Sequence, residues 1–284
     1  DNWTKKVLET CFASPAPEDA HGFMDGLSMH YYTVPGESWM NKGFATEFTT
    51  DGWYQALGKA LHMDDLIKKH GAILDQYDPE KKIGLIVDEW GNWHEVEPGT
   101  NPGFLYQNTM RDALVAAVTL NIFNKHCDRV KMACIAQLIN VLQSVILTEG
   151  EKMILTPTYH IFHMYKYHQD AELLHSDLTG VDTIQNGEFS IPALQESVSV
   201  QKDGTITVTL ANLSAEQSYP VEIALTEKKN RTVSAKILTG AMNAHNTFEE
   251  PDAVKEESFE GVAEKDGTLS LEIPACSVIC LRIS

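Results

Sequence analysis

The sequence predicts an α/β region followed by an all-β region, with the change near residue 170. Before that point, short apolar, β-prone segments alternate with longer helical patterns, as in a parallel sheet covered by helices. After it the helical patterns disappear, and β-branched residues alternate with polar ones. We expect two parts, residues 1–168 and residues 169–284, that pack firmly together because no flexible Gly/Ser linker joins them.

The first part contains three β segments, each followed by a helical pattern. "GFMDGLSMHYY" precedes a helix expected around Gln55 to Tyr77, "IGLIVDEW" precedes one from about Phe104 to Lys125, and "RVKMACIAQ" precedes one around Tyr159 to His168. The opening "DNWTKKVLETC" also has a helical pattern and lacks the features of a signal peptide. The chain therefore reads as if it begins inside a folded domain.

The second part reads as a series of short antiparallel strands, among them "SVSVQKDGTITVTLANLS" and "GTLSLEIPACSVICLRIS". Asp203-Gly204 and Asp266-Gly267 separate alternating runs, and Asp-Gly in that position is the strongest short-range signal for a hairpin. We predict an antiparallel sandwich or jelly roll of about eight strands.

Composition excludes several classes of function. The chain has 22 Lys and Arg against 40 Asp and Glu, a net charge of −18, which repels phosphates and argues against nucleic acid binding as a function. A neutral or cationic substrate fits this charge better than a polyanion. No apolar stretch approaches the roughly 18 residues of a membrane span, so we expect a soluble globular protein that does not bind membranes.

The five cysteines show neither a C-x-x-C pair nor regular spacing. Their odd number and irregular spacing argue against a disulfide framework and a zinc site. We expect reduced, mostly buried thiols in a cytoplasmic protein, at Cys11, Cys127, Cys134, Cys276 and Cys280.

Each β segment of the first part ends in polar or aromatic side chains. In β/α barrels the active site is built at the carboxyl ends of the strands. The same position in three successive segments therefore predicts a functional site there. The candidates are His30, Tyr31 and Tyr32 after the first segment, Asp88, Glu89 and Trp90 after the second, and Gln137 and Asn140 after the third.

Glu89 is the candidate nucleophile. A carboxylate just past a buried strand, flanked by Trp90 and Trp93, is suited to attack an anomeric carbon, because aromatic faces pack on sugar C–H surfaces. The alternative is a helix N-cap or a surface salt bridge. Strand alternation turns Asp88 away from the side on which Glu89 lies, so we expect a structural role for Asp88.

Three further residues complete the predicted site. Tyr32 could hydrogen-bond the nucleophile and keep it ionised, and His30 could bind a sugar hydroxyl or a neighbouring carboxylate. For His30, a satisfied structural histidine is an equal alternative. Gln137 has both a donor and an acceptor for hydroxyl recognition, or it is a buried amide bonded to backbone.

The histidines of "TYHIFHMYKYH" raise the question of a metal site. Ile, Phe, Met and Tyr at helical spacing around His160, His163 and His168 favour a helix that covers the sheet. No third convergent carboxylate or thiolate is visible, so we expect neither a metal nor a cofactor.

Several motifs together resemble one family. "MDGLSMHYYT", "DEWGNWH", "IAQLINVLQSVILTEGEKMILTPTYHIFHMY", "NTFEEPDAV" and "SVICLRIS" are similar to the C-terminal two-thirds of α-L-arabinofuranosidases of glycoside hydrolase family 51. The resemblance covers essentially the whole chain. It implies the last strands of a (β/α)8 TIM barrel followed by a jelly-roll β-sandwich, and retaining hydrolysis of terminal arabinofuranosyl groups of arabinan, arabinoxylan or their oligosaccharides.

The resemblance also implies roles for individual residues. By position in the motifs, the nucleophile falls on Glu89 and its supporting tyrosine on Tyr32. The sugar-contacting histidine falls on His30, the sugar-site tryptophan on Trp93, and the glutamine on Gln137.

One departure from the family concerns the acid/base glutamate, which belongs to the fourth barrel strand and thus to a segment upstream of this chain. A retaining glycosidase needs two carboxyl groups about 5 to 5.5 Å apart. Glu47 and Glu95 are expected in loops and do not replace it. We expect the upstream half of the barrel as a separate polypeptide or a missing segment, because exposed barrel edges destabilise an isolated monomer. The resemblance also implies that the complete protein is a homo-oligomer.

Two other functions remain open on the sequence. The chain could be a non-catalytic carbohydrate-binding or scaffold remnant, which the absence of a partner with five β/α units would favour. It could also belong to a related barrel glycosidase that acts on another sugar, which a panel of aryl glycosides distinguishes.

Overall fold

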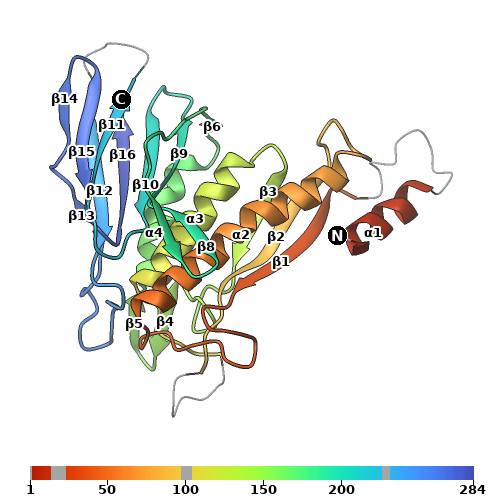
Figure 1. The fold of residues 1–284 in the computed structure, drawn as a ribbon, viewed down its shortest axis with the longest axis horizontal. Helices are drawn as coiled ribbons and strands as arrows, with labels where there is room; N and C mark the ends of the chain where they lie inside the picture. Colours follow the sequence, from red (N-terminus) through yellow and green to blue (C-terminus); the bar gives the residue numbers. More distant parts are fainter. Residues whose placement is uncertain (1, 14–23, 97–103, 226–230) are drawn as a thin grey trace.

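The computed structural model describes residues 2–13, 24–96, 104–225 and 231–284. The first part contains a parallel sheet in the order β1-β2-β3, and a helix follows each strand (Figure 1). This confirms the predicted alternation. The elements are α1 (Asn2–Ala13), β1 (Gly26–Thr33), α2 (Thr50–Leu74), β2 (Gly84–Asn92), α3 (Met110–Lys125), β3 (Val130–Ile135), α4 (Pro157–Tyr165) and a 3-10 turn (Lys166–His168).

Threonine caps decide where the helices begin. Thr49 accepts a hydrogen bond from the Gly52 N–H, so α2 starts five residues before the predicted Gln55. Thr109 and Asp112 form a capping box, so α3 starts at Met110 rather than near Phe104. Helix α4 begins after Thr156 and ends at Tyr165, where the 3-10 turn takes over.

A hairpin between β3 and α4 escaped the sequence prediction. Strands β4 (Ile146–Glu149) and β5 (Lys152–Leu155) pair antiparallel, and Gly150 in their turn has a φ of 56°. Each strand has only four residues and the turn is Gly-Glu, so neither alternation nor a common turn dipeptide marks it.

The second part consists of antiparallel sheets, as predicted. The largest sheet has the order β13-β12-β16-β10-β9-β6 and a second has the order β11-β15-β14, and β7 and β8 form a separate two-stranded sheet. Apolar side chains of the first two sheets form one cluster, so these two pack face to face. Asp266 and Gly267 join β14 to β15 with φ values of 51° and 81°, as a primed turn requires. The strands are β6 (Glu172–Leu173), β7 (Thr183–Asn186), β8 (Phe189–Pro192), β9 (Leu194–Val200), β10 (Ile206–Asn212), β11 (Tyr219–Ala224), β12 (Val233–Thr239), β13 (Glu257–Ser258), β14 (Ala263–Lys265), β15 (Thr268–Ile273) and β16 (Ser277–Ile283).

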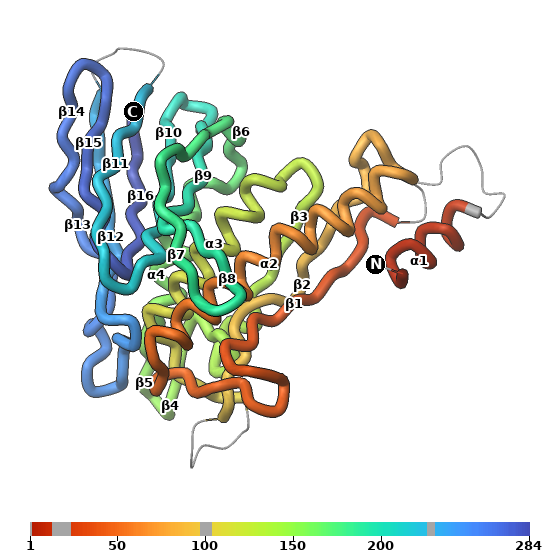
Figure 2. Tube along the Cα trace, in the orientation of Figure 1, coloured from red at the N-terminus to blue at the C-terminus, as the bar shows by residue number. Residues whose placement is uncertain are grey.

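Helices α2, α3 and α4 lie between the parallel sheet and the β-sandwich (Figures 1 and 2). A single hydrophobic cluster runs through these layers, from Leu85 of β2 through Leu114 of α3 to Val278 of β16. Helix α3 is buried at 13 of its 16 residues, because it has a sheet on each side. The expected firm packing is confirmed, whereas a division at residues 168 and 169 stays a prediction.

The opposite face of the parallel sheet is uncovered among the described residues. Ser28 and His30 of β1 and Cys134 of β3 are exposed there, and Met132 of β3 is 51% exposed. Met132 and Cys134 are apolar or weakly polar, and a sheet in water usually hides such residues.

The expectation that the cysteines are mostly buried is wrong. Cys276 and Cys280 are buried in the sandwich, Cys11 is half-buried, and Cys127 and Cys134 are exposed.

Among the helices that the structure describes, none is both long enough and apolar enough to cross a membrane.

Candidate active site

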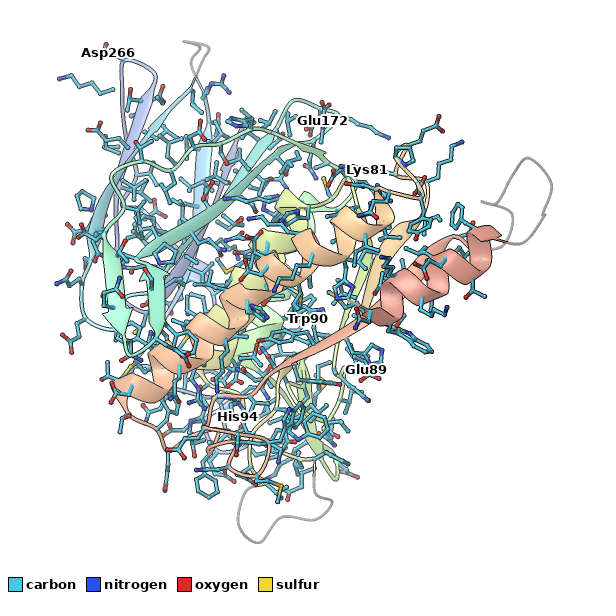
Figure 3. The ribbon with its side chains drawn as sticks, turned by 45° about the vertical axis from the view of Figure 1, so that its right-hand side comes forward. Lys81, Glu89, Trp90, His94, Glu172 and Asp266 are labelled. Atoms are coloured by element: carbon cyan, nitrogen blue, oxygen red, sulfur yellow. The ribbon has the colours of Figure 1, made fainter. Side chains whose placement is uncertain are left out.

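The carboxyl end of β2 carries the candidate nucleophile. Figure 3 labels Lys81 before this strand and His94 after it, with Glu89 and Trp90 between them. The pairing with β1 shifts there: Ser28 lies opposite Ile86, and His30 lies opposite Glu89. Strand β2 therefore holds one residue more than β1 over this stretch, which is a β-bulge.

The predicted orientation of Asp88, away from the side on which Glu89 lies, is wrong because of this bulge. Because an extra residue interrupts the alternation, Asp88 and Glu89 both lie beside the His30 ring rather than on opposite faces. His30 Nε2 is 3.1 Å from Asp88 Oδ1, and its Nδ1 is 3.5 Å from Glu89 Oε2. The hydroxyl of Ser28 donates to Asp88 Oδ1 over 2.7 Å. That hydrogen bond, together with nearby His30, holds the pKa of Asp88 below its usual value.

Glu89 is held by one further hydrogen bond and remains open to solvent. The Tyr32 hydroxyl donates to Glu89 Oε2 over 2.7 Å, and the Glu89 side chain is 45% exposed. Burial and the neighbouring Glu89 raise the pKa of Tyr32, so the phenol stays a neutral donor at physiological pH. Glu89 lies within β2, and Thr109 caps the helix that follows, so the N-cap alternative for Glu89 is wrong.

Trp93 forms an aromatic wall beside this carboxylate. Its ring centroid lies 4.9 Å from that of Tyr32, 5.7 Å from Phe104 and 5.3 Å from Trp39. Trp90 does not contribute to the wall. It is 1% exposed and packs against Phe123 of α3 and Phe162 of α4, so only one of the two tryptophans that flank Glu89 in sequence lies at the site.

Gln137 is exposed, and no hydrogen bond of its side chain is found among the described residues. The buried-amide alternative for Gln137 is therefore wrong, and it applies instead to Gln143. The Gln143 amide accepts from the Asn92 N–H over 2.7 Å and donates to the Asp112 carbonyl over 2.8 Å and to Thr158 Oγ1 over 3.1 Å. It ties the end of β2 to α3 and α4, a role that no sequence signal indicated.

A buried charged network lies under the same strand end. Asp112 accepts from Asn92 Nδ2 and from His94 Nε2, both over 2.8 Å, and Arg111 Nη2 lies 3.3 Å from His94 Nδ1. Arginine can only donate, so His94 accepts at Nδ1 and carries its proton on Nε2. Burial lowers the pKa of His94, although Asp112 opposes the shift, and the ring is neutral. The network fixes the chain where β2 ends, three residues after Glu89.

The three histidines in and after α4 lie in different surroundings. His163 Nδ1 lies 2.8 Å from Glu256 Oε1, His168 Nδ1 lies 2.7 Å from Ser199 Oγ, and His160 is buried. The predicted helix forms over His160 and His163, whereas His168 lies in the 3-10 turn that follows it. No group of three potential metal ligands occurs in the part of the chain that the structure describes.

Comparison with known proteins identifies the family. Residues 88–277 match the α-L-arabinofuranosidase C-terminal domain. The chain is 46% identical, over 92% of its length and 51% of the relative, to an intracellular exo-α-L-arabinofuranosidase of Bacteroides ovatus. It is 26% identical, over 93% of its length and 40% of the relative, to an intracellular exo-α-(1→5)-L-arabinofuranosidase of Streptomyces lividans.

The fold agrees with these relatives. The crystal structure of a family GH51 arabinofuranosidase from Xanthomonas axonopodis pv. citri superposes with a TM-score of 0.92 and 42% identity, over 100% of this chain and 56% of that one. The chain thus spans about half the length of these proteins rather than the expected two-thirds. It belongs to the α-L-arabinofuranosidase C-terminal domain family and corresponds to the C-terminal part of a glycoside hydrolase family 51 arabinofuranosidase.

Proposed function

We propose that this chain supplies the nucleophile of a retaining α-L-arabinofuranosidase that releases terminal arabinofuranosyl groups from arabinan, arabinoxylan and their oligosaccharides. The hydrogen bond from Tyr32 to Glu89 carries the proposal, because it orients a half-exposed carboxylate at a strand end beside the Trp93 ring. The relatives' names support the sugar and the exo mode of action.

In the first step, a Glu89 oxygen attacks the anomeric carbon and forms a glycosyl ester. The bond to the glycosidic oxygen breaks, and that oxygen takes a proton from a second carboxyl group. In the next step the second group removes a proton from water, which attacks the same carbon and releases Glu89. Two inversions give net retention. We propose that His30, Trp93 and Gln137 contact the arabinofuranosyl ring.

Asp88 is unsuited to act as the second group. It adjoins Glu89 on the same strand, and its lowered pKa keeps it ionised where an acid must carry a proton. Glu47 and Glu95 lie outside the helices and strands. The acid is therefore proposed to come from a segment outside this chain.

That segment would be the upstream half of a (β/α)8 barrel. The uncovered face of the parallel sheet supports this, as do β1 and β3, which are the edge strands of the three-stranded sheet. Five further β/α units would pair with these edges and bury Met132 and Cys134. They could belong to the same polypeptide or to another one. A homo-oligomer in the cytoplasm, without nucleic acid or membrane partners, completes the proposal.

Labelling with a mechanism-based arabinofuranosyl inactivator tests the proposal. The complete enzyme should carry the label on Glu89, and a label on another residue would remove this assignment. Glu89→Ala should lower turnover by several orders of magnitude with the fold intact, and azide should restore activity and give an inverted glycosyl azide. Glu47→Ala, at an exposed loop position, is the matched control and should leave turnover unchanged.

A purely structural role for Glu89 and the two rival functions each predict another outcome. If Glu89 were only a surface ion-pair partner, Glu89→Ala would lower stability by about 1 kcal/mol or less and leave turnover nearly unchanged. A panel of aryl glycosides would reveal another sugar specificity. Binding without hydrolysis by every assembly that contains this chain would identify a carbohydrate-binding remnant.

A further inference from the structure

The loop after β1 presents two apolar side chains at its tip. Ser38 and Asn41 exchange backbone hydrogen bonds of 3.2 Å and 3.1 Å, which places Trp39 and Met40 at the centre of a tight turn. Trp39 is 55% exposed and Met40 is 91% exposed. Two adjacent large apolar side chains exposed together form a small apolar surface, and such surfaces mark sites that bind a ligand or another surface.

The turn is anchored rather than loose. The N–H of Gly36 donates to the Lys42 carbonyl over 2.6 Å, and the Lys42 N–H donates to Glu95 Oε1 over 2.9 Å. Glu95 follows β2, and its own N–H donates to the Gly43 carbonyl over 2.8 Å. A Cβ at Gly36 would overlap the Asn41 carbonyl, so the close approach of the two arms requires glycine there. The loop after β1 is thereby fastened to the segment that follows Glu89's strand.

Trp39 is the third aromatic ring in a series of contacts that leads away from the candidate nucleophile. Tyr32 contacts Glu89, Trp93 contacts Tyr32, and Trp39 meets Trp93 edge-on at an interplanar angle of 81°. Trp93 stands next to the place of the sugar that Glu89 would attack. Trp39 lies one ring farther along and is more exposed. A substrate cleaved at its end continues beyond the broken bond toward solvent, and aromatic rings commonly line such positions.

We infer that the Trp39 ring binds the sugar on the leaving side of the cleaved bond, and so sets the preference for oligosaccharides over simple glycosides. This inference rests on the proposed hydrolase function. The ligand class is a neutral furanose or pyranose ring, whose C–H face can pack on the indole without any charge. The competing occupant is the upstream half of the protein, packed over the same turn.

The test compares two substrates in the complete enzyme. Methyl α-L-arabinofuranoside has a leaving group too small to reach Trp39, whereas arabinotriose places a sugar there. Trp39→Ala should lower kcat/KM for arabinotriose roughly 3- to 10-fold, the range of one aromatic contact, and should change kcat/KM for the methyl glycoside by less than about 2-fold. Trp39→Phe should recover most of the loss. Met40→Ala removes an exposed side chain from the same turn and should affect neither substrate.

Each other outcome overturns the inference. Equal losses on both substrates, or a lower Tm, would mean that Trp39 supports Trp93 or packs against the upstream half. No loss on either substrate, or a selective loss for Met40→Ala as well, would remove the ring as the binding group. A wild-type enzyme inactive on both substrates would instead refute the proposed function itself, and the leaving-side assignment with it.

Discussion

Tyr31 and Tyr32 are neighbours in β1 whose hydroxyl groups bond on opposite faces of the sheet. Tyr32 donates to Glu89 Oε2 over 2.7 Å, and Tyr31 donates to the Lys59 carbonyl of α2 over 2.7 Å. The two bonds have the same length and the same donor chemistry. Only the Tyr32 bond reaches the candidate site. Comparing variants of the two tyrosines therefore distinguishes the effect of losing a hydrogen bond on stability from its effect on catalysis.

Tyr32→Phe should therefore reduce kcat/KM on an arabinofuranoside while Tyr31→Phe does not. Loss of a hydrogen bond to a charged acceptor is worth roughly 1.5 to 3 kcal/mol, or roughly 10- to 150-fold. Tyr31→Phe should lower the free energy of unfolding by about 1 kcal/mol and leave the rate unchanged. Steady-state kinetics and thermal melts of both variants provide the comparison, and similar rates for the two variants would contradict the role of Tyr32.

Asp112→Asn should change how stability depends on pH. Burial alone would raise the pKa of Asp112, but His94, Arg111 and the Thr109 N–H outweigh it and lower the pKa to about 2. The unfolded value is about 3.9, so the ionised carboxylate stabilises the fold above about pH 4, and this contribution is lost as pH falls toward about 2. The variant should lose about 3 kcal/mol at pH 7, because it removes the buried negative charge that favours the charged form of buried Arg111. The difference in Tm should shrink below pH 4.

The matched control for that experiment is Asp51→Asn, at an exposed acid in the first turn of α2. It should change stability by less than about 0.5 kcal/mol. A Tm difference between wild type and Asp112→Asn that stays constant from pH 7 to pH 2 would show that the charge on Asp112 is not what stabilises the network.

Alanine substitutions at two glycines of α2 should change the stability of the protein in opposite directions. A Cβ on Gly58 would overlap the Phe189 ring of β8, whereas a Cβ on Gly71 would meet only Arg129 Cγ at 3.9 Å. Gly58→Ala should cost roughly 1 to 3 kcal/mol through overpacking, and Gly71→Ala should stabilise the helix by up to about 1 kcal/mol. Calorimetric Tm values measure both effects. Phe189→Leu added to Gly58→Ala should restore part of the loss, and shifts of equal sign for the two glycines would be inconsistent with this packing.

Thiol reactivity should report on the uncovered face of the parallel sheet. In the isolated chain, iodoacetamide should modify the exposed thiols of Cys134 and Cys127. Cys276 and Cys280 should react only after unfolding, because burial raises the pKa of these two thiols to about 12. In an assembly with the upstream half, Cys134 should become protected. Mass spectrometry of the peptides measures each site, and rapid labelling of Cys134 in an active assembly would argue against a closed barrel.

The order of the elements could be predicted from the sequence because hydrophobic periodicity records which faces are buried. The three parallel strands and the Asp266-Gly267 hairpin are examples. The β4–β5 hairpin could not, since its strands are too short for a period to show. The helices α2 and α3 also begin at other residues than predicted. A threonine caps a helix only if its backbone is extended at that point, as at Thr49 and Thr109, and the sequence does not record this.

The candidate site was predicted in its parts and missed in its arrangement. Their positions at strand ends were enough to predict that Tyr32, Glu89 and His30 lie close together. In the structure, Tyr32 and His30 both contact Glu89. The bulge that turns Asp88 to the same side has no sequence signature, because one extra residue in a strand looks like any other. The choice between Gln137 and Gln143 likewise depends on contacts with α3 and α4 that local sequence does not record.

Helix α3, buried on both sides, makes the β-sandwich inseparable from the parallel sheet. A chain cut after residue 168 would expose the sandwich-facing side of α3 to water, including Asn121, whose amide oxygen accepts hydrogen bonds from Ser197 and Thr209. Such a fragment would present a large apolar surface and aggregate. The sandwich is thus not a separate module appended to a catalytic unit. Removing it would take away the packing that holds α3, and with it the support of the strand that carries Glu89.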